Sequence, residues 1–126
     1  LQATSPLRQK KDLLNALKRF ENAKMMDLMM AVTKAENHAL KYGYVTNGTF
    51  NHISDPNLCF ENRQKLPKLF KPTGTFYIFK AGWYLKNKTL ATYSTGAYEI
   101  PQDQSLDIDT VADLKLFEDI LKKRRT

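Results

Sequence analysis

Residues 1–33 are predicted to form an extended segment, an amphipathic helix and a second extended segment. This order of elements constrains the fold more than any other feature of the chain. Residues 1–3 look like the end of a strand, and Ser5-Pro6 fits a helix N-cap followed by proline at the first helical position. Residues 27–33 are short, apolar and bounded by charge, which favours a buried strand. Strand, helix and strand within about thirty residues predict a βαβ unit and a parallel sheet. We expect this helix to end near Asn22. Its inward face comprises Leu13, Leu14, Leu17 and Phe20.

Further strands and turns follow in the rest of the chain. Asn47-Gly48 is a strong signal for a two-residue hairpin turn. Prolines at 67 and 72 exclude a long helix over residues 61–72. Residues 75–79 are aromatic and β-branched and predict a strand, as do residues 96–100, whereas residues 81–86 fit a short helix.

The last predicted helix begins after Thr110. Thr110 and Asp113 stand three positions apart, which is close to the capping box that begins many helices. Apolar residues recur behind them at helical spacing, so we expect this helix to bury one face. That face comprises Leu114, Phe117, Ile120 and Leu121.

Composition limits the class of protein. A chain of 126 residues with 42% hydrophobic and 26% charged residues fits one globular domain. The single cysteine, Cys59, excludes an internal disulfide, so we expect a cytoplasmic protein. The longest wholly apolar run is residues 28–32, far too short to span a bilayer, and we expect no membrane partner.

The chain is basic, with a formal net charge of +7 and a pI near 9.5. This balance permits nucleic acid, phosphate or an anionic sugar as a ligand. The basic residues are dispersed along the chain, and neither a GxxG clamp nor an aromatic RNA-binding stripe occurs. We therefore expect no nucleic-acid partner. A basic binding module remains an alternative that a salt-dependent affinity for unrelated oligonucleotides would favour.

Two carboxylates stand two positions apart in the segment 105–110. In an extended segment, Asp107 and Asp109 project from the same face, while Leu106 and Ile108 turn toward the core. Two acidic oxygen donors on one face suit a hard divalent cation such as Mg²⁺. The alternative is a solvated loop end, because this spacing is common by chance.

Other catalytic motifs are absent from the sequence. His38 and His52 lie far apart, without cysteine or carboxylate at zinc spacing. The chain has no G-x-S-x-G, no Walker A motif and no dinucleotide fingerprint. If the protein handles a nucleoside triphosphate, the loop that holds the phosphates is not in these residues.

Five motifs stand in the order of one family: residues 2–8, 31–33 with His38 behind them, 63–68, 73–78 and 105–110. In these motifs the chain resembles the C-terminal half or more of the acylneuraminate cytidylyltransferases. The resemblance covers nearly all 126 residues of this chain. The related 3-deoxy-manno-octulosonate cytidylyltransferases match less well. Two departures are visible: Ala3 stands where the family usually has proline, and residues 73–75 read Thr-Gly-Thr instead of Asn-Gly-Ala.

The resemblance implies an α/β fold, a Rossmann-like nucleotidyltransferase three-layer sandwich with a mixed, mainly parallel sheet and a small dimerisation extension. Residues 1–126 would form the C-terminal part of a single cytidylyltransferase domain, and residues 42–98 would include the extension that makes a homodimer. The family's N-terminal loop, which binds the CTP phosphates, has no counterpart here. We therefore expect these residues alone to be inactive.

The resemblance also implies a reaction. The anomeric hydroxyl of a nine-carbon α-keto acid sugar attacks the α-phosphate of CTP and expels pyrophosphate, with Mg²⁺ or Mn²⁺ as cofactor. Asp107 and Asp109 match the metal-binding carboxylates of the family, and Arg63 would meet the sugar carboxylate or a phosphate through its planar guanidinium. The catalytic set is then Asp107, Asp109 and Arg63, and the substrate-binding set is Gln2, Thr4, Ser5, Arg63 and Tyr77.

Each of these residues also has an ordinary structural interpretation. Gln2 would be a strand-end residue, Arg63 a surface base and Tyr77 a core aromatic. Residues 73–78 look more like the sialic and legionaminic acid branches than the pseudaminic acid branch, which favours an N-acetylneuraminate-type sugar. The alternatives are a synthetase for legionaminic, pseudaminic or octulosonic acid, or an inactive fragment.

Overall fold

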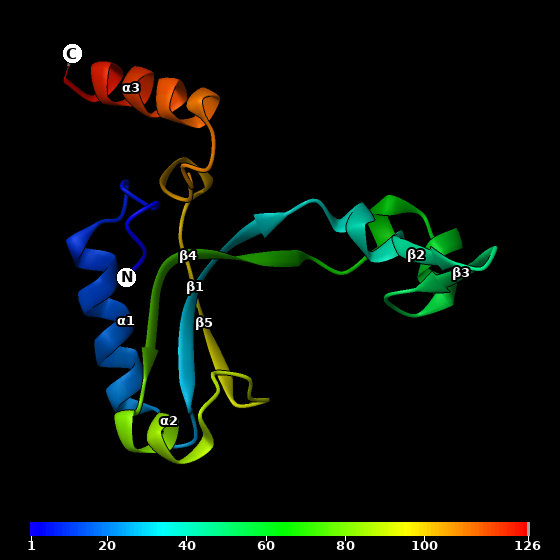
Figure 1. Cartoon of the computed structure of the whole chain (residues 1–126), viewed down its shortest axis with the longest axis horizontal. Helices are drawn as coiled ribbons and strands as arrows, with labels where there is room; N and C mark the ends of the chain where they lie inside the picture. Colours follow the sequence, from blue (N-terminus) through cyan, green and yellow to red (C-terminus); the bar gives the residue numbers. More distant parts are fainter. Residues whose placement is uncertain (126) are drawn as a thin grey trace. The chain divides into compact units, whose positions relative to one another are not determined.

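The computed structural model describes residues 1–125, which form two compact units, one of residues 1–33 with 72–125 and one of residues 34–71. No helix within the described part of the chain is long and apolar enough to cross a membrane. The helices are α1 (Lys10–Asn22), α2 (Ala81–Asn87) and α3 (Val111–Arg125); the strands are β1 (Leu28–Ala35), β2 (Gly43–Thr46), β3 (Thr49–His52), β4 (Leu69–Phe79) and β5 (Thr95–Glu99) (Figure 1).

The first unit is built on a three-stranded sheet in the order β4-β1-β5. β1 and β5 are parallel, with Leu28 opposite Thr95 and Val32 opposite Glu99. β4 runs in the opposite direction to β1, so the sheet is mixed (Figure 1). The α/β class is confirmed, as are the strands predicted at 27–33, 75–79 and 96–100 and the helix predicted at 81–86.

Helix α1 lies against one face of this sheet (Figure 1). Its inward side chains, Ala16 and Phe20, pack with the strand residues at the centre of the unit. Burial of this apolar surface is the main force that holds helix and sheet together. The buried cluster comprises Ala16, Phe20, Met29, Ala31, Phe76 and Ile100, with Leu13, Met26, Ile78 and Tyr98 packed around it.

The segment before α1 differs from the prediction. No strand forms at residues 1–3, because the chain turns there and the Gln2 carbonyl accepts from the Ser5 backbone N–H (3.4 Å). Helix α1 begins at Lys10, and its N-cap is Gln9 rather than Ser5. The Ser5 hydroxyl donates to the Thr73 carbonyl instead (3.3 Å), so the tertiary contact takes the group that would have capped the helix. The predicted βαβ unit is therefore wrong in its first strand.

The second unit contains the hairpin that Asn47-Gly48 predicts. β2 and β3 pair antiparallel, with Thr46 opposite Thr49. Asn47 and Gly48 both have positive φ, at 49° and 77°. These two residues form the kind of turn whose twist matches the twist of the flanking strands.

Helix α3 has the predicted N-terminal cap but not the predicted burial. Asp113 accepts from the Thr110 backbone N–H (2.8 Å) and hydroxyl (2.7 Å), and the Thr110 hydroxyl accepts from the Asp113 N–H (3.2 Å). The bonds from the Thr110 hydroxyl and N–H lower the pKa of Asp113, so this cap stabilises the fold above the ordinary Asp pKa and is lost as the pH falls through the lowered value. No side chain of α3 is buried, and Leu114 is 45% exposed. The buried stripe expected on this helix is therefore wrong for the described chain.

Candidate functional site at the carboxyl edge of the sheet

The carboxyl ends of β1 and β5 lie at one edge of the sheet because the two strands are parallel. Just beyond this edge, the Ile108 N–H donates to the Thr4 carbonyl (2.8 Å). The N-terminal segment and the segment that carries Asp107 and Asp109 are thus joined through the backbone. Two predicted site segments, residues 2–5 and residues 107–109, therefore lie in one part of the first unit.

Buried hydroxyl groups fasten the N-terminal segment to the sheet. Ser5, Thr73 and Thr75 are all buried, and the Ser5 hydroxyl donates to the Thr73 carbonyl. The Thr73 hydroxyl donates to the Ala31 carbonyl (3.3 Å) and lies 2.9 Å from that of Thr75. Buried polar groups are costly unless they are paired, so this network fixes the position of the segment. Thr4, in contrast, is exposed, and a substrate contact by either residue stays a prediction.

Gln2 lies over a glycine of strand β4. Gly74 has a φ of +69°, and a Cβ added there would overlap the Gln2 Oε1 atom. Arg8 holds the backbone below, because its Nη1 donates to the carbonyls of Gln2 (2.9 Å) and Thr75 (3.4 Å). The Gln2 residue is exposed, and its amide can both donate and accept. Gly74 therefore provides the space in which this amide sits.

Gly74→Ala is expected to destabilise the protein by ~1–2 kcal/mol, because an L-residue at this positive φ is strained, and to displace Gln2. Urea denaturation measures the first effect. Gly82→Ala is the matched control, since a Cβ there meets nothing within 4 Å in helix α2 and alanine is the better helix former. A lower urea midpoint for Gly74→Ala and an equal or higher one for Gly82→Ala is the expected pair of results. Equal midpoints for Gly74→Ala and the wild type would contradict it.

Asp107 has a carboxylate oxygen that is buried and unsatisfied within the described chain. Its Oδ1 is buried and has no hydrogen-bond partner among the described residues. Buried polar atoms without partners are rare, and an unseen cation is one ordinary explanation. Asp109 is exposed, and its backbone N–H donates to Asp113 (3.2 Å).

Asp107 and Asp109 offer the type of oxygen that a hard divalent cation binds, and metal binding by them stays a prediction. Mg²⁺ is ordinarily bound by one or two carboxylates together with phosphate oxygens and waters. The buried hydroxyl of Thr33, within β1, also has no partner in residues 1–125, but no contact links it to either carboxylate. No group of three or more His, Cys, Asp or Glu side chains that could hold a metal occurs in that part of the chain.

Tyr77 lies in strand β4 and is half-buried. Phe76 and Ile78 pack in the core against α1. Side chains alternate along a strand, so Tyr77 projects from the opposite face of the sheet. On that face the Tyr77 ring can line a pocket. It can equally pack against a further layer of structure that covers the sheet.

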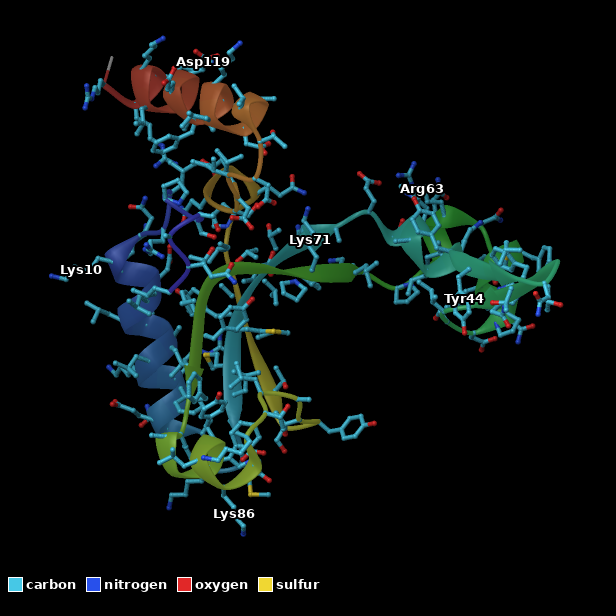
Figure 2. The ribbon with its side chains drawn as sticks, viewed as in Figure 1. Lys10, Tyr44, Arg63, Lys71, Lys86 and Asp119 are labelled. Atoms are coloured by element: carbon cyan, nitrogen blue, oxygen red, sulfur yellow. The ribbon has the colours of Figure 1, made fainter. Side chains whose placement is uncertain are left out.

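Arg63 lies in the second unit and is labelled in Figure 2. Its side chain is 64% exposed and forms an ion pair with Glu36 through Nη2. The same nitrogen lies 3.4 Å from Nδ1 of His38. Glu36 was not predicted as a partner of this arginine, because it lies 27 positions earlier, at the start of the 3-10 helix Asn37–Lys41, and no local pattern links the two residues. The sequence analysis also missed Arg8 and the role of Gly74.

The chain is similar in sequence to several known proteins. No family model matches it. It is 27% identical over 124 residues to the post-translational flagellin modification protein B of Campylobacter coli, covering 98% of this chain and 52% of that protein. It is 29% identical over 118 residues to an N-acylneuraminate cytidylyltransferase of Streptococcus agalactiae, covering 87% of this chain and 26% of the relative.

A third relative is the CMP-N,N'-diacetyllegionaminic acid synthase of Campylobacter jejuni, 32% identical over 59 residues. That match covers 47% of this chain and 25% of the relative. The chain thus spans about half of the length of the first relative and about a quarter of the other two. The expected resemblance to the acylneuraminate cytidylyltransferases is confirmed by homologues that bear this name.

Proposed function

We propose that this chain is part of a nucleotidyltransferase that activates a nine-carbon α-keto acid sugar with CTP, giving a CMP-sugar and pyrophosphate. The observation that carries the proposal is the similarity to an N-acylneuraminate cytidylyltransferase over 87% of the chain. The buried Oδ1 of Asp107, which has no partner within residues 1–125, agrees with a metal ligand at this position. Ligands of open α/β sheets bind at the carboxyl edge of the sheet.

We assign a chemical task to each of five residues, four in the first unit and Arg63 in the second. Mg²⁺ or Mn²⁺ held by Asp107 and Asp109 would neutralise phosphate charge that otherwise repels the sugar hydroxyl. Gln2 orients the sugar by donating and accepting hydrogen bonds, and Arg63 binds an anion, either the sugar carboxylate or a phosphate. Tyr77 lines the acyl-sugar pocket with an apolar ring and a polar tip. Positioning of the two substrates supplies much of the remaining rate enhancement.

The architecture of the complete enzyme belongs to the same proposal. A three-layer sandwich would cover the sheet face from which Tyr77 projects, opposite α1. A homodimer would cover the exposed apolar side chains of residues 42–60, where Tyr44 is 61%, Val45 71% and Phe60 88% exposed. Contiguous exposed apolar patches commonly mark interaction sites. Sedimentation at increasing concentration measures this association.

For the sugar, we propose the N-acetylneuraminate type. In a competition assay with CTP, N-acetylneuraminate is expected to have a kcat/KM at least about tenfold above that of pseudaminic acid, since a few pocket contacts discriminate by this amount. The assay also includes legionaminic acid and the eight-carbon octulosonate as competing sugars. The enzyme assayed is the natural protein that carries this sequence. Preference for pseudaminic acid or the octulosonate would overturn the assignment, and preference for legionaminic acid would select the alternative that the Campylobacter jejuni relative suggests.

A further inference from the structure

Three side chains from two separated segments meet in the second unit. Nη2 of Arg63 pairs with Oε2 of Glu36, and Nδ1 of His38 lies 3.4 Å from both of these atoms. The backbones of the two segments are also joined, because the Asn37 amide donates to the Arg63 carbonyl (3.1 Å). The segment 36–38 therefore holds both the main chain and the side chain of Arg63.

The ion pair is too exposed to be a stability device. Glu36 is 70% and Arg63 64% exposed at the side chain. Exposed ion pairs contribute little to folding because water and salt screen them. The ion pair instead restricts the rotamers of the Arg63 side chain before a ligand binds. Arg63 therefore loses less conformational entropy on binding than a free arginine side chain would.

Only one guanidinium nitrogen is used in this arrangement. Within residues 1–125, Nη2 makes the contacts to Glu36 and His38, whereas Nε and Nη1 have no hydrogen-bond partner. A guanidinium presents five N–H groups in a rigid fork, so an anion can still bind the remaining groups. The carboxylate of Glu36 thus leaves Arg63 oriented and available.

We propose that Glu36 is a positioning residue for anion binding by Arg63. The anion is a carboxylate or phosphate of a substrate, and this inference rests on the proposed function. His38 completes the cluster, since its Nδ1 lies 3.4 Å from both Nη2 of Arg63 and Oε2 of Glu36. Glu36 touches no substrate in this role and acts through Arg63.

The test compares Glu36→Gln with Arg63→Lys in the natural protein that carries this sequence. Arg63→Lys keeps the charge but removes the planar fork, and is expected to raise one substrate KM by about tenfold or more. Glu36→Gln is expected to raise the same KM by about threefold to tenfold through misplacement of the guanidinium, with kcat and the urea midpoint unchanged. A rise in the sugar KM assigns the sugar carboxylate, and a rise in the CTP KM assigns a phosphate.

Two further variants make the result specific. Glu61→Gln removes a carboxylate from the same unit, one that accepts from the Asn62 N–H (3.1 Å) and lies 4.0 Å from Lys65, and should leave both KM values unchanged. The double variant Glu36→Gln/Arg63→Lys should match Arg63→Lys alone, since residues that act through one another are not additive.

The outcomes separate the two levels of the proposal. An effect of Arg63→Lys with none of Glu36→Gln overturns the positioning role and leaves Arg63 as the anion ligand. Unchanged KM values for both variants overturn the role of Arg63 and the inference together. Absence of CMP-sugar synthesis by the wild-type protein with every nine-carbon sugar tested rejects the proposed function itself, and the inference with it.

Discussion

Asp109→Asn is expected to lower CTP-dependent sugar activation by at least about a hundredfold, because it removes half of the carboxylate charge offered to the divalent cation. The fold should remain, since Asp109 is exposed and contributes only its backbone N–H to the cap of α3. Initial rates at saturating Mg²⁺ measure the effect. Binding of Mn²⁺, followed by electron paramagnetic resonance without substrates, gives a second readout that is independent of turnover.

Asp103→Asn is the matched control for this variant. Asp103 is exposed, lies four positions before Asp107 and is 3.8 Å from Arg124. It should retain wild-type rates and Mn²⁺ binding. Wild-type turnover by Asp109→Asn at saturating Mg²⁺ would remove this residue from the metal site.

The second large effect concerns stability. Phe76, in β4, is 1% exposed and belongs to the buried cluster that joins the sheet to α1 in the first unit. Phe76→Ala is expected to lower the free energy of unfolding by about 3–5 kcal/mol, because it removes a buried ring and leaves a cavity. Urea denaturation followed by circular dichroism measures this change.

Met25→Ala is the corresponding control. Met25 lies in the first unit and is 88% exposed, so its truncation should change the free energy of unfolding by no more than about 0.5 kcal/mol. If the two variants unfold at the same urea concentration, the buried cluster around Phe76 does not hold the first unit together.

The elements that the sequence predicted well are those with a local cause. Asn47-Gly48 sets the hairpin because two consecutive positive φ angles strongly favour these residues. Thr110 and Asp113 set the start of α3 through bonds within one turn. The strand predicted at residues 27–33 forms as β1 (Leu28–Ala35), because a short apolar run can be buried on both faces of a sheet.

The elements that it missed depend on distant partners. Ser5-Pro6 carries a good local signal for a helix start, but the Ser5 hydroxyl contacts Thr73, 68 positions later. The apolar stripe of α3 has the right spacing for burial, yet burial needs a covering surface that periodicity cannot supply.

For the candidate site, sequence reasoning identified the types of side chain and the structure adds their surroundings. Asp107 and Asp109 follow from spacing, whereas the partnerless oxygen of Asp107 is visible only in three dimensions. The contact between Gln2 and Gly74 joins residues 72 positions apart and has no local signature. Metal binding and the task of Arg63 stay predictions that the variants above address, and the task of Tyr77 stays a prediction.

The second unit is an insertion between two neighbouring strands of the sheet. The chain leaves the first unit after Thr33 in β1 and returns at Pro72 in β4, and these strands are adjacent and antiparallel there (Figure 1). The bond between the Thr73 hydroxyl and the Ala31 carbonyl shows how close the two crossing points are. A turn of about two to five residues ordinarily joins such strands. The length of residues 34–71 can therefore change without shifting the register of β1 and β4, because the contact between Thr73 and Ala31 fixes the two points where the chain leaves the first unit and returns to it.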